Sequence, residues 1–83
     1  MSFEADGVGM PRLTELKTGE IGVVIQVAGG YGLRQKLALR GIKEGSWLRM
    51  VSSSGGPVVV ESRGSQIALG RGMAQKVVVG VIR

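Results

Sequence analysis

The sequence predicts a mostly β protein: a small closed barrel of about five short strands, with one short α-helix inserted after the first strand. Three observations support this prediction. Val and Ile supply a large share of the apolar residues, and β-branched side chains favour strands over helices. Short apolar runs alternate with turns rich in Gly, of which the chain has 15. The length of 83 residues fits one domain with a small core.

The first strand is predicted from alternating apolar residues. Residues 1–10 have no periodicity, and we expect them to form a flexible leader to a domain that spans residues 11–83. Ile21 to Val27 then reads as a strand, in which Val23, Ile25 and Val27 share an apolar face. The other face holds Gly22, Val24 and Gln26.

The helix is predicted from a run of good helix formers between two Gly-rich turns. It spans Leu33 to Arg40, and Gly41 suits the position that follows a helix C-terminus. Leu33 and Leu37 are four residues apart, so they share a face and should dock on the sheet. Leu39 points well away from them, which predicts an exposed apolar side chain.

Four further strands are expected after the helix. They lie at residues 46–52, 58–62, 66–69 and 76–82, and turns rich in Gly and Ser separate them. Leu48 and Met50 should face inward, and residues 70–74 form a tight excursion before the last strand. Closing the sheet would remove exposed edges, which otherwise invite aggregation in a Val-rich chain.

Composition argues against most enzyme chemistry. The chain has no Cys and no His, so thiolate and imidazole are absent as nucleophiles, bases and metal ligands. No acidic pair has ligand spacing, and we expect no catalytic residue, no metal site and no cofactor. The loop Gly29-Gly30-Tyr31-Gly32 departs from both Gly-rich phosphate-binding patterns, so a plain turn is favoured over phosphate binding.

The net charge of +5 suggests an acidic partner. Lys36, Arg40 and Lys43 would form a basic stripe if the helical phase continued past Gly41, and Leu39 would lie beside it. Basic residues around an exposed apolar residue are a common interface composition, although a solvated helix face explains the same pattern about as well. Nucleic-acid binding is not expected, because the few aromatic residues are far apart in sequence.

Several short motifs occur in a distinctive order from about Arg12 to Val79. They are Leu13-Thr14-Glu15-Leu16, Gly19, Gly22-Val23-Val24, Lys36-Leu37, Gly41-Ile42, Gly45, Gly56-Pro57-Val58-Val59-Val60, Ile67-Ala68-Leu69, Ala74 and Val77-Val78-Val79. In this order and spacing they resemble the FeoA family, small cytoplasmic proteins of the ferrous iron transport system. The resemblance implies an SH3-like barrel with a helical insertion after its first strand.

The resemblance also implies a function. It suggests a non-enzymatic accessory and regulatory protein of ferrous iron uptake, which binds the cytoplasmic, GTPase-bearing region of a FeoB-type transporter. The expected partner-binding residues are Leu33, Lys36, Leu39, Arg40 and Lys43. The sequence departs from the family pattern at Glu44, where the family often has Pro, at Arg40, where it often has an apolar residue, and at Gly70-Arg71-Gly72. The first two departures make the helix and its turn more charged, so these contacts should be specific to this chain.

Two other functions remain open at this stage. One is an SH3-like regulatory module of an iron-dependent transcriptional repressor system, and the other is a basic nucleic-acid-binding barrel. No helix-turn-helix is evident, so the chain would not read a promoter alone. The start of the sequence lacks the features of a secretory signal, which predicts a cytoplasmic protein. It should meet the membrane only through the transporter, and a homo-oligomer is possible.

Overall fold

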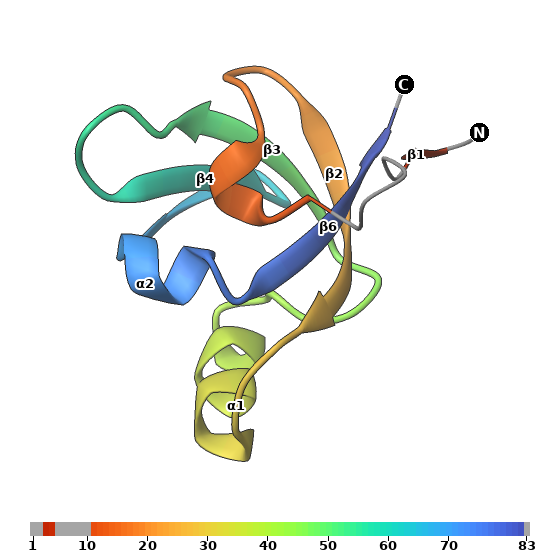
Figure 1. The fold of residues 1–83 in the computed structure, drawn as a ribbon, viewed down its shortest axis with the longest axis vertical. Coiled ribbons are helices and arrows are strands. Elements are labelled where there is room, and N and C mark those ends of the chain that lie inside the picture. Colours follow the sequence, from red (N-terminus) through yellow and green to blue (C-terminus); the bar gives the residue numbers. More distant parts are fainter. Residues whose placement is uncertain (1–2, 5–10, 83) are drawn as a thin grey trace.

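The computed structural model describes residues 3–4 and 11–82, which form six strands, two α-helices and one 3₁₀-helix. Along the chain the elements are β1 (Phe3–Glu4), η1 (Leu13–Glu15), β2 (Ile21–Val27), α1 (Tyr31–Leu39), β3 (Trp47–Ser52), β4 (Val58–Ser62), β5 (Ser65–Leu69), α2 (Arg71–Ala74) and β6 (Val77–Ile82). Figure 1 shows the long strands curled around one core, with α1 projecting from one end of the barrel.

All strand pairs are antiparallel, in the order β1-β6-β2-β3-β4-β5. The fully buried side chains come from η1, α1, the turn after α1 and every long strand. The largest of them are Leu13, Leu37, Ile42, Leu48, Met50, Leu69, Val24, Val58, Val60, Val77 and Val79. Leu48 and Met50 thus face inward as predicted, and the mostly β barrel with a helix after its first long strand is confirmed. The predicted closure of the sheet is wrong for the described residues, because the strand order begins at β1 and ends at β5, and these two strands do not pair.

The buried face of β2 differs from the prediction. Val24 is buried in the first half of the strand, whereas Val23 and Ile25 are only half-buried. The pairing of β2 with β6 shifts by one residue between Val24 and Gln26, so Ile25 is an extra, bulged residue. Alternation therefore changes phase, and Val27 turns into the core. The sequence alternation alone could not reveal this shift.

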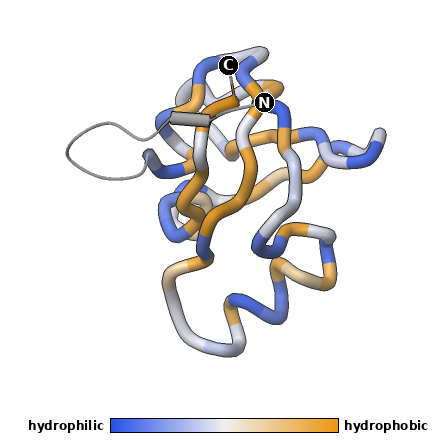
Figure 2. The backbone as a smooth tube through the Cα atoms, turned by 90° about the vertical axis from the view of Figure 1, so that its right-hand side faces the viewer, coloured by the Kyte–Doolittle hydropathy of each residue, from blue (hydrophilic) through white to orange (hydrophobic). Residues whose placement is uncertain are grey.

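The helix α1 begins two residues earlier than predicted and ends one residue earlier. Its N-terminal residue is Tyr31 and its last is Leu39. Gly41 follows with φ +88, a left-handed conformation that Gly adopts at no steric cost. Leu37 is fully buried and Leu33 packs partly against the core, so both dock on the barrel as predicted. In Figure 2, apolar and polar residues alternate along this projecting segment, whereas apolar residues dominate the central strands.

Two short elements differ from the sequence reading. Residues 71–74 of the predicted excursion form the one-turn helix α2, in which Ala74 is buried. The strand β1 was not predicted: Phe3 and Glu4 pair with Ile82 and Val81 of β6. The remainder of the predicted leader, residues 1–2 and 5–10, lies outside the described residues. Among the described helices, none is long and apolar enough to span a membrane.

Candidate partner-binding surface

The projecting helix α1 carries the most exposed large apolar side chain among the described residues. Leu39 is 84% exposed, as the sequence predicted, because it lies on the face of α1 away from buried Leu37. Tyr31, at the start of the same helix, is 76% exposed. The two residues lie at opposite ends of α1, so this projecting helix offers two separate apolar contacts to a partner.

Leu33 connects the exposed helix α1 to the core of the barrel. It is only half-buried, but its side chain packs against the core and fills the space beside Gly29. A Cβ atom added at Gly29 would lie 2.9 Å from Leu33 Cδ2, and the φ of +141 at Gly29 also disfavours any side chain. The turn before α1 therefore needs Gly at this position, and Leu33 fixes how the helix sits on the barrel.

The three predicted basic residues do not form one continuous stripe. A continuous stripe would require the helix to continue past Gly41. The helix α1 ends at Leu39, so Lys43 does not follow its spacing. Arg40 turns toward β5, where its Nη1 donates a hydrogen bond to the carbonyl oxygen of Ala68 at 3.1 Å. Lys43 lies in the following turn, beyond a hollow that separates it from α1, while Lys36 is exposed on the helix.

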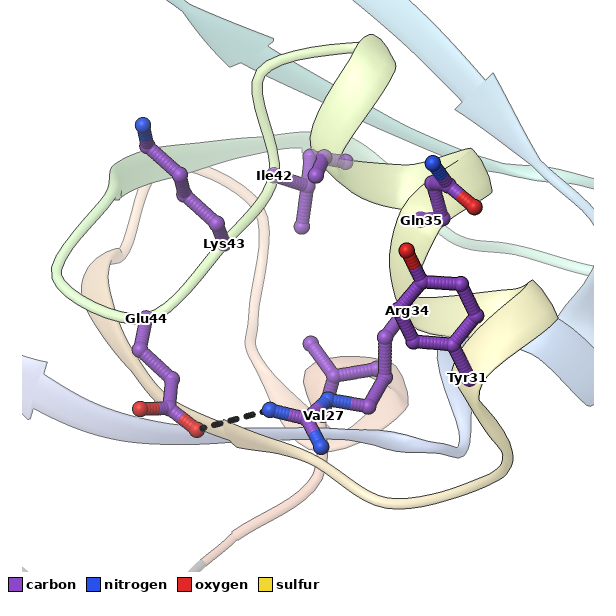
Figure 3. A pocket seen from close by; sticks show the side chains of 8 residues that line it. Val27, Tyr31, Arg34, Gln35, Ile42, Lys43 and Glu44 are labelled. Carbon is purple, nitrogen blue, oxygen red and sulfur yellow. Dashed lines mark ion pairs between the residues drawn. The ribbon is translucent and has the colours of Figure 1, made fainter.

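The hollow between α1 and this turn has a volume of about 600 Å³. Its lining residues are Val27, Tyr31, Arg34, Gln35, Ala38, Ile42, Lys43 and Glu44. In Figure 3, Lys43 and Glu44 stand on one side and Tyr31, Arg34 and Gln35 on the other. The lining thus combines apolar side chains with charged ones of both signs, which would suit an apolar side chain of a partner flanked by a polar group.

The turn that carries Lys43 and Glu44 is firmly attached to the barrel. The amide of Gly45 donates to the carbonyl of Val24, and the amide of Val24 donates to the carbonyl of Ser46, each at 2.8 Å. The Ser46 hydroxyl accepts from the Lys43 amide at 3.1 Å. These bonds bring residues of the turn opposite α1, so they create the hollow.

The hollow adds residues that sequence reasoning did not single out as binding residues: Tyr31, Arg34 and Glu44. Arg34 Nη2 and Glu44 Oε2 are 4.0 Å apart across its mouth, and both side chains are more than half exposed. Arg34 and Glu44 are ten positions apart in the sequence, and they come close only because the chain turns back at Gly41, which has a left-handed conformation. A Gly at this point was the available signal.

A second exposed apolar area lies on the outer face of β2 and β3. Trp47 is 47% exposed and Ile21 is 39% exposed. Trp47 pairs with Val23, and Ile21 pairs with Arg49. Arg49 Nε donates to Glu61 Oε1 at 3.0 Å on the neighbouring strand, so the charge beside this area is already neutralised. Neither area contains three potential metal-ligating side chains, and no such group occurs elsewhere in residues 3–4 and 11–82.

Comparison with protein families identifies the chain. The sequence profile of the FeoA domain matches residues 12–81, which is most of the chain. The protein belongs to the FeoA family. A relative from Methanocaldococcus jannaschii is named Fe(2+) transport protein A. It is 41% identical over 70 residues, which cover 84% of this chain and 85% of the relative.

Solved structures agree with this assignment to the FeoA family. A crystal structure of an iron uptake regulatory protein, FeoA, has a TM-score of 0.84 at 31% identity, covering 88% of this chain and 99% of that chain. A zinc complex of FeoA from Stenotrophomonas maltophilia, described as an SH3 domain protein, has a TM-score of 0.73 at 28% identity over 83% of this chain and 88% of the other. The predicted SH3-like fold is therefore confirmed.

The same fold occurs in a manganese-dependent transcriptional repressor. The match has a TM-score of 0.81 at 23% identity and covers 88% of this chain but 37% of the repressor. At this identity the likeness shows a shared fold and nothing about function.

Proposed function

We propose that this FeoA-family protein is an accessory and regulatory protein of ferrous iron uptake that acts by binding, without catalysis, the cytoplasmic GTPase-bearing region of a FeoB-type transporter. Family membership supports the transport context, together with the name of the M. jannaschii relative. The observation that carries the binding mode is Leu39, an 84% exposed Leu on a helix that projects from the barrel. Covering this side chain with a partner would remove most of its apolar surface from water, which favours binding.

The proposed contact surface keeps the residues predicted from the sequence and gives them different roles. Leu39 is the apolar anchor, and Lys36 is the nearest helix cation with no ion pair among the described residues. Lys43 adds charge at the far side of the hollow. Leu33 acts indirectly by seating α1, and Arg40 is already engaged with Ala68.

The partner surface should be acidic around an apolar pocket. Within the contact surface, Lys36 and Lys43 have no carboxylate within ion-pair distance among the described residues, so their charge is available to a partner. Such rim charges mainly raise the association rate and make binding sensitive to salt, while the buried anchor provides most of the affinity. Iron itself is the cargo of the transporter, and no role in holding it is assigned to this chain.

A charge reversal tests the proposal against a matched control. Lys36→Glu should weaken binding to the purified cytoplasmic region of the transporter by roughly five- to tenfold at low salt, and the effect should shrink at high salt. Lys17→Glu changes the net charge equally but lies in the turn before β2, where Gly19 bonds to Met50 of β3. It should leave affinity within about twofold. Equal affinities for both variants would contradict the proposed surface.

The repressor and nucleic-acid alternatives predict a different result. A nucleic-acid-binding barrel would shift short single- or double-stranded DNA at low salt, and its affinity would fall steeply as salt rises. We expect no shift of either DNA with the wild-type chain. A repressor module would bind a DNA-binding protein in place of the transporter, so co-purification with the transporter separates these two candidates.

A further inference from the structure

The strand β5 leaves one edge of the sheet open. It is last in the strand order and pairs only with β4 among the described strands. The two strands are joined by Arg63 and Gly64, with φ values of +53 and +82, which is a type I′ hairpin turn. Ser62 and Ser65 flank the turn and pair directly with each other.

The hairpin register shows which backbone groups of β5 point outward. In a two-residue hairpin the flanking residues form a hydrogen-bonded pair, and such pairs alternate along an antiparallel ladder. Ile67 therefore directs its amide and carbonyl toward β4, opposite Val60. Gln66 and Ala68 direct theirs away from the sheet, and both residues are exposed. These outward groups are a template for another strand.

The strand itself carries none of the usual protection for an open edge. Its sequence, Ser-Gln-Ile-Ala-Leu, has no charged residue and no Pro. Its pairing with β4 runs without a register shift, so no bulge twists the edge away. An uncharged, regular edge strand invites pairing between copies. Because an antiparallel pair of identical strands is two-fold symmetric, β5 of a second copy is a complementary occupant.

Protection comes instead from the end of α1. Arg40 Nη1 donates to the outward carbonyl oxygen of Ala68 at 3.1 Å, across 28 residues of sequence. This bond occupies an acceptor that an added strand would need. It also holds a guanidinium group at the edge, so an antiparallel β5 pair would bring two such charges close together. We propose that Arg40 guards the open edge of β5 and prevents this chain from pairing with β5 of a second copy.

Replacing Arg40 should allow the isolated chain to self-associate. A symmetric pair must break two Arg40 contacts, each worth roughly a factor of five, so Arg40→Ala should associate about 25-fold more tightly than wild type. Arg40→Met, which keeps most of the stem, should behave like Arg40→Ala. Lys36→Ala removes an equal charge from α1 without removing the contact to Ala68, and it should match wild type. Sedimentation equilibrium over a concentration series measures all four chains.

A second substitution tests whether association uses the β5 edge. The amide of Ala68 points outward, so Ala68→Pro removes a donor from the edge without breaking a bond to β4. Added to Arg40→Ala, it should restore wild-type behaviour, and Gln66→Lys should do the same by adding charge to the edge. If Arg40→Ala sediments like wild type, or if its association survives both edge substitutions, the proposal is overturned. No transporter is present, so this result is independent of the proposed function.

Discussion

The surface on α1 and the outer face of β2 and β3 both expose large apolar side chains, but they are built differently. On the sheet, Trp47 and Ile21 lie opposite Val23 and Arg49, and Arg49 is bonded to Glu61. On the helix, Leu39 is nearly twice as exposed as Trp47, at 84% against 47%. Single exposed apolar residues are common on protein surfaces, so the difference lies in how much apolar area each region offers to a partner.

The attachment of the two regions also differs. The outer sheet face belongs to strands whose inner residues fill the core. The helix α1 is held to the barrel mainly through Leu37, which is fully buried, and Leu33, which is half-buried. The position of the helix on the barrel therefore depends on a few side-chain contacts. Those contacts can be removed one at a time.

The largest effect should come from Leu37→Ala. Deleting a fully buried Leu side chain costs about 3 kcal/mol, because it loses apolar burial and leaves a cavity. Trp47→Ala, on the exposed sheet face, should cost about 1 kcal/mol or less. Urea unfolding measures both free energies. A smaller loss for Leu37→Ala than for Trp47→Ala would contradict the view that α1 depends on this anchor.

A smaller loss is expected from Gly29→Ala. The added Cβ would lie 2.9 Å from Leu33 Cδ2 at a backbone φ of +141, so both the turn and the seating of α1 are strained. We expect a cost of about 2 kcal/mol. Gly32→Ala is the matched control, because it lies within α1 with nothing within 4 Å of the new Cβ. It should stabilise the protein by up to about 1 kcal/mol, and a loss there would refute this account of the helix.

The smallest effects concern the two ion pairs, one in each region. Arg49 and Glu61 are directly opposite on adjacent strands, and Nε and Oε1 are 3.0 Å apart. A double-mutant cycle on stability should give a coupling of about 0.5–1 kcal/mol. Arg34 and Glu44 are 4.0 Å apart and more than half exposed, so their coupling should stay below about 0.3 kcal/mol. A stronger coupling in the second pair would mean that the hollow is more rigid than the sheet.

The sequence predicted the strands and the helix well because each of them follows from local patterns. Alternation marked β2 with its observed bounds, and helix formers before Gly41 marked α1 within two residues. The exposure of Leu39 followed from helix geometry alone. The bulge at Ile25 could not be predicted, because it depends on pairing with β6, a strand more than 50 residues later.

The candidate surface was only partly predictable for the same reason. Lys36, Leu39 and Arg40 are near each other in sequence, and helix spacing placed them together. The hollow requires the turn at Gly45 to bond to Val24, and the Arg40 contact requires β5 to lie beside the end of α1. Both are long-range consequences of the barrel. They change the expected basic stripe into a split arrangement in which Arg40 faces β5 and Lys43 borders the hollow.

The most direct test of the central claim compares Leu39 with Trp47 in binding. Isothermal titration of the transporter's cytoplasmic region with Leu39→Asp should show a loss of affinity of at least about tenfold, because the anchor would be replaced by a charge. Trp47→Asp should stay within about twofold of wild type, since the proposed contact surface does not include the outer sheet face. If Leu39→Asp binds like wild type while Trp47→Asp loses affinity, the partner engages the sheet and the claim about α1 is wrong.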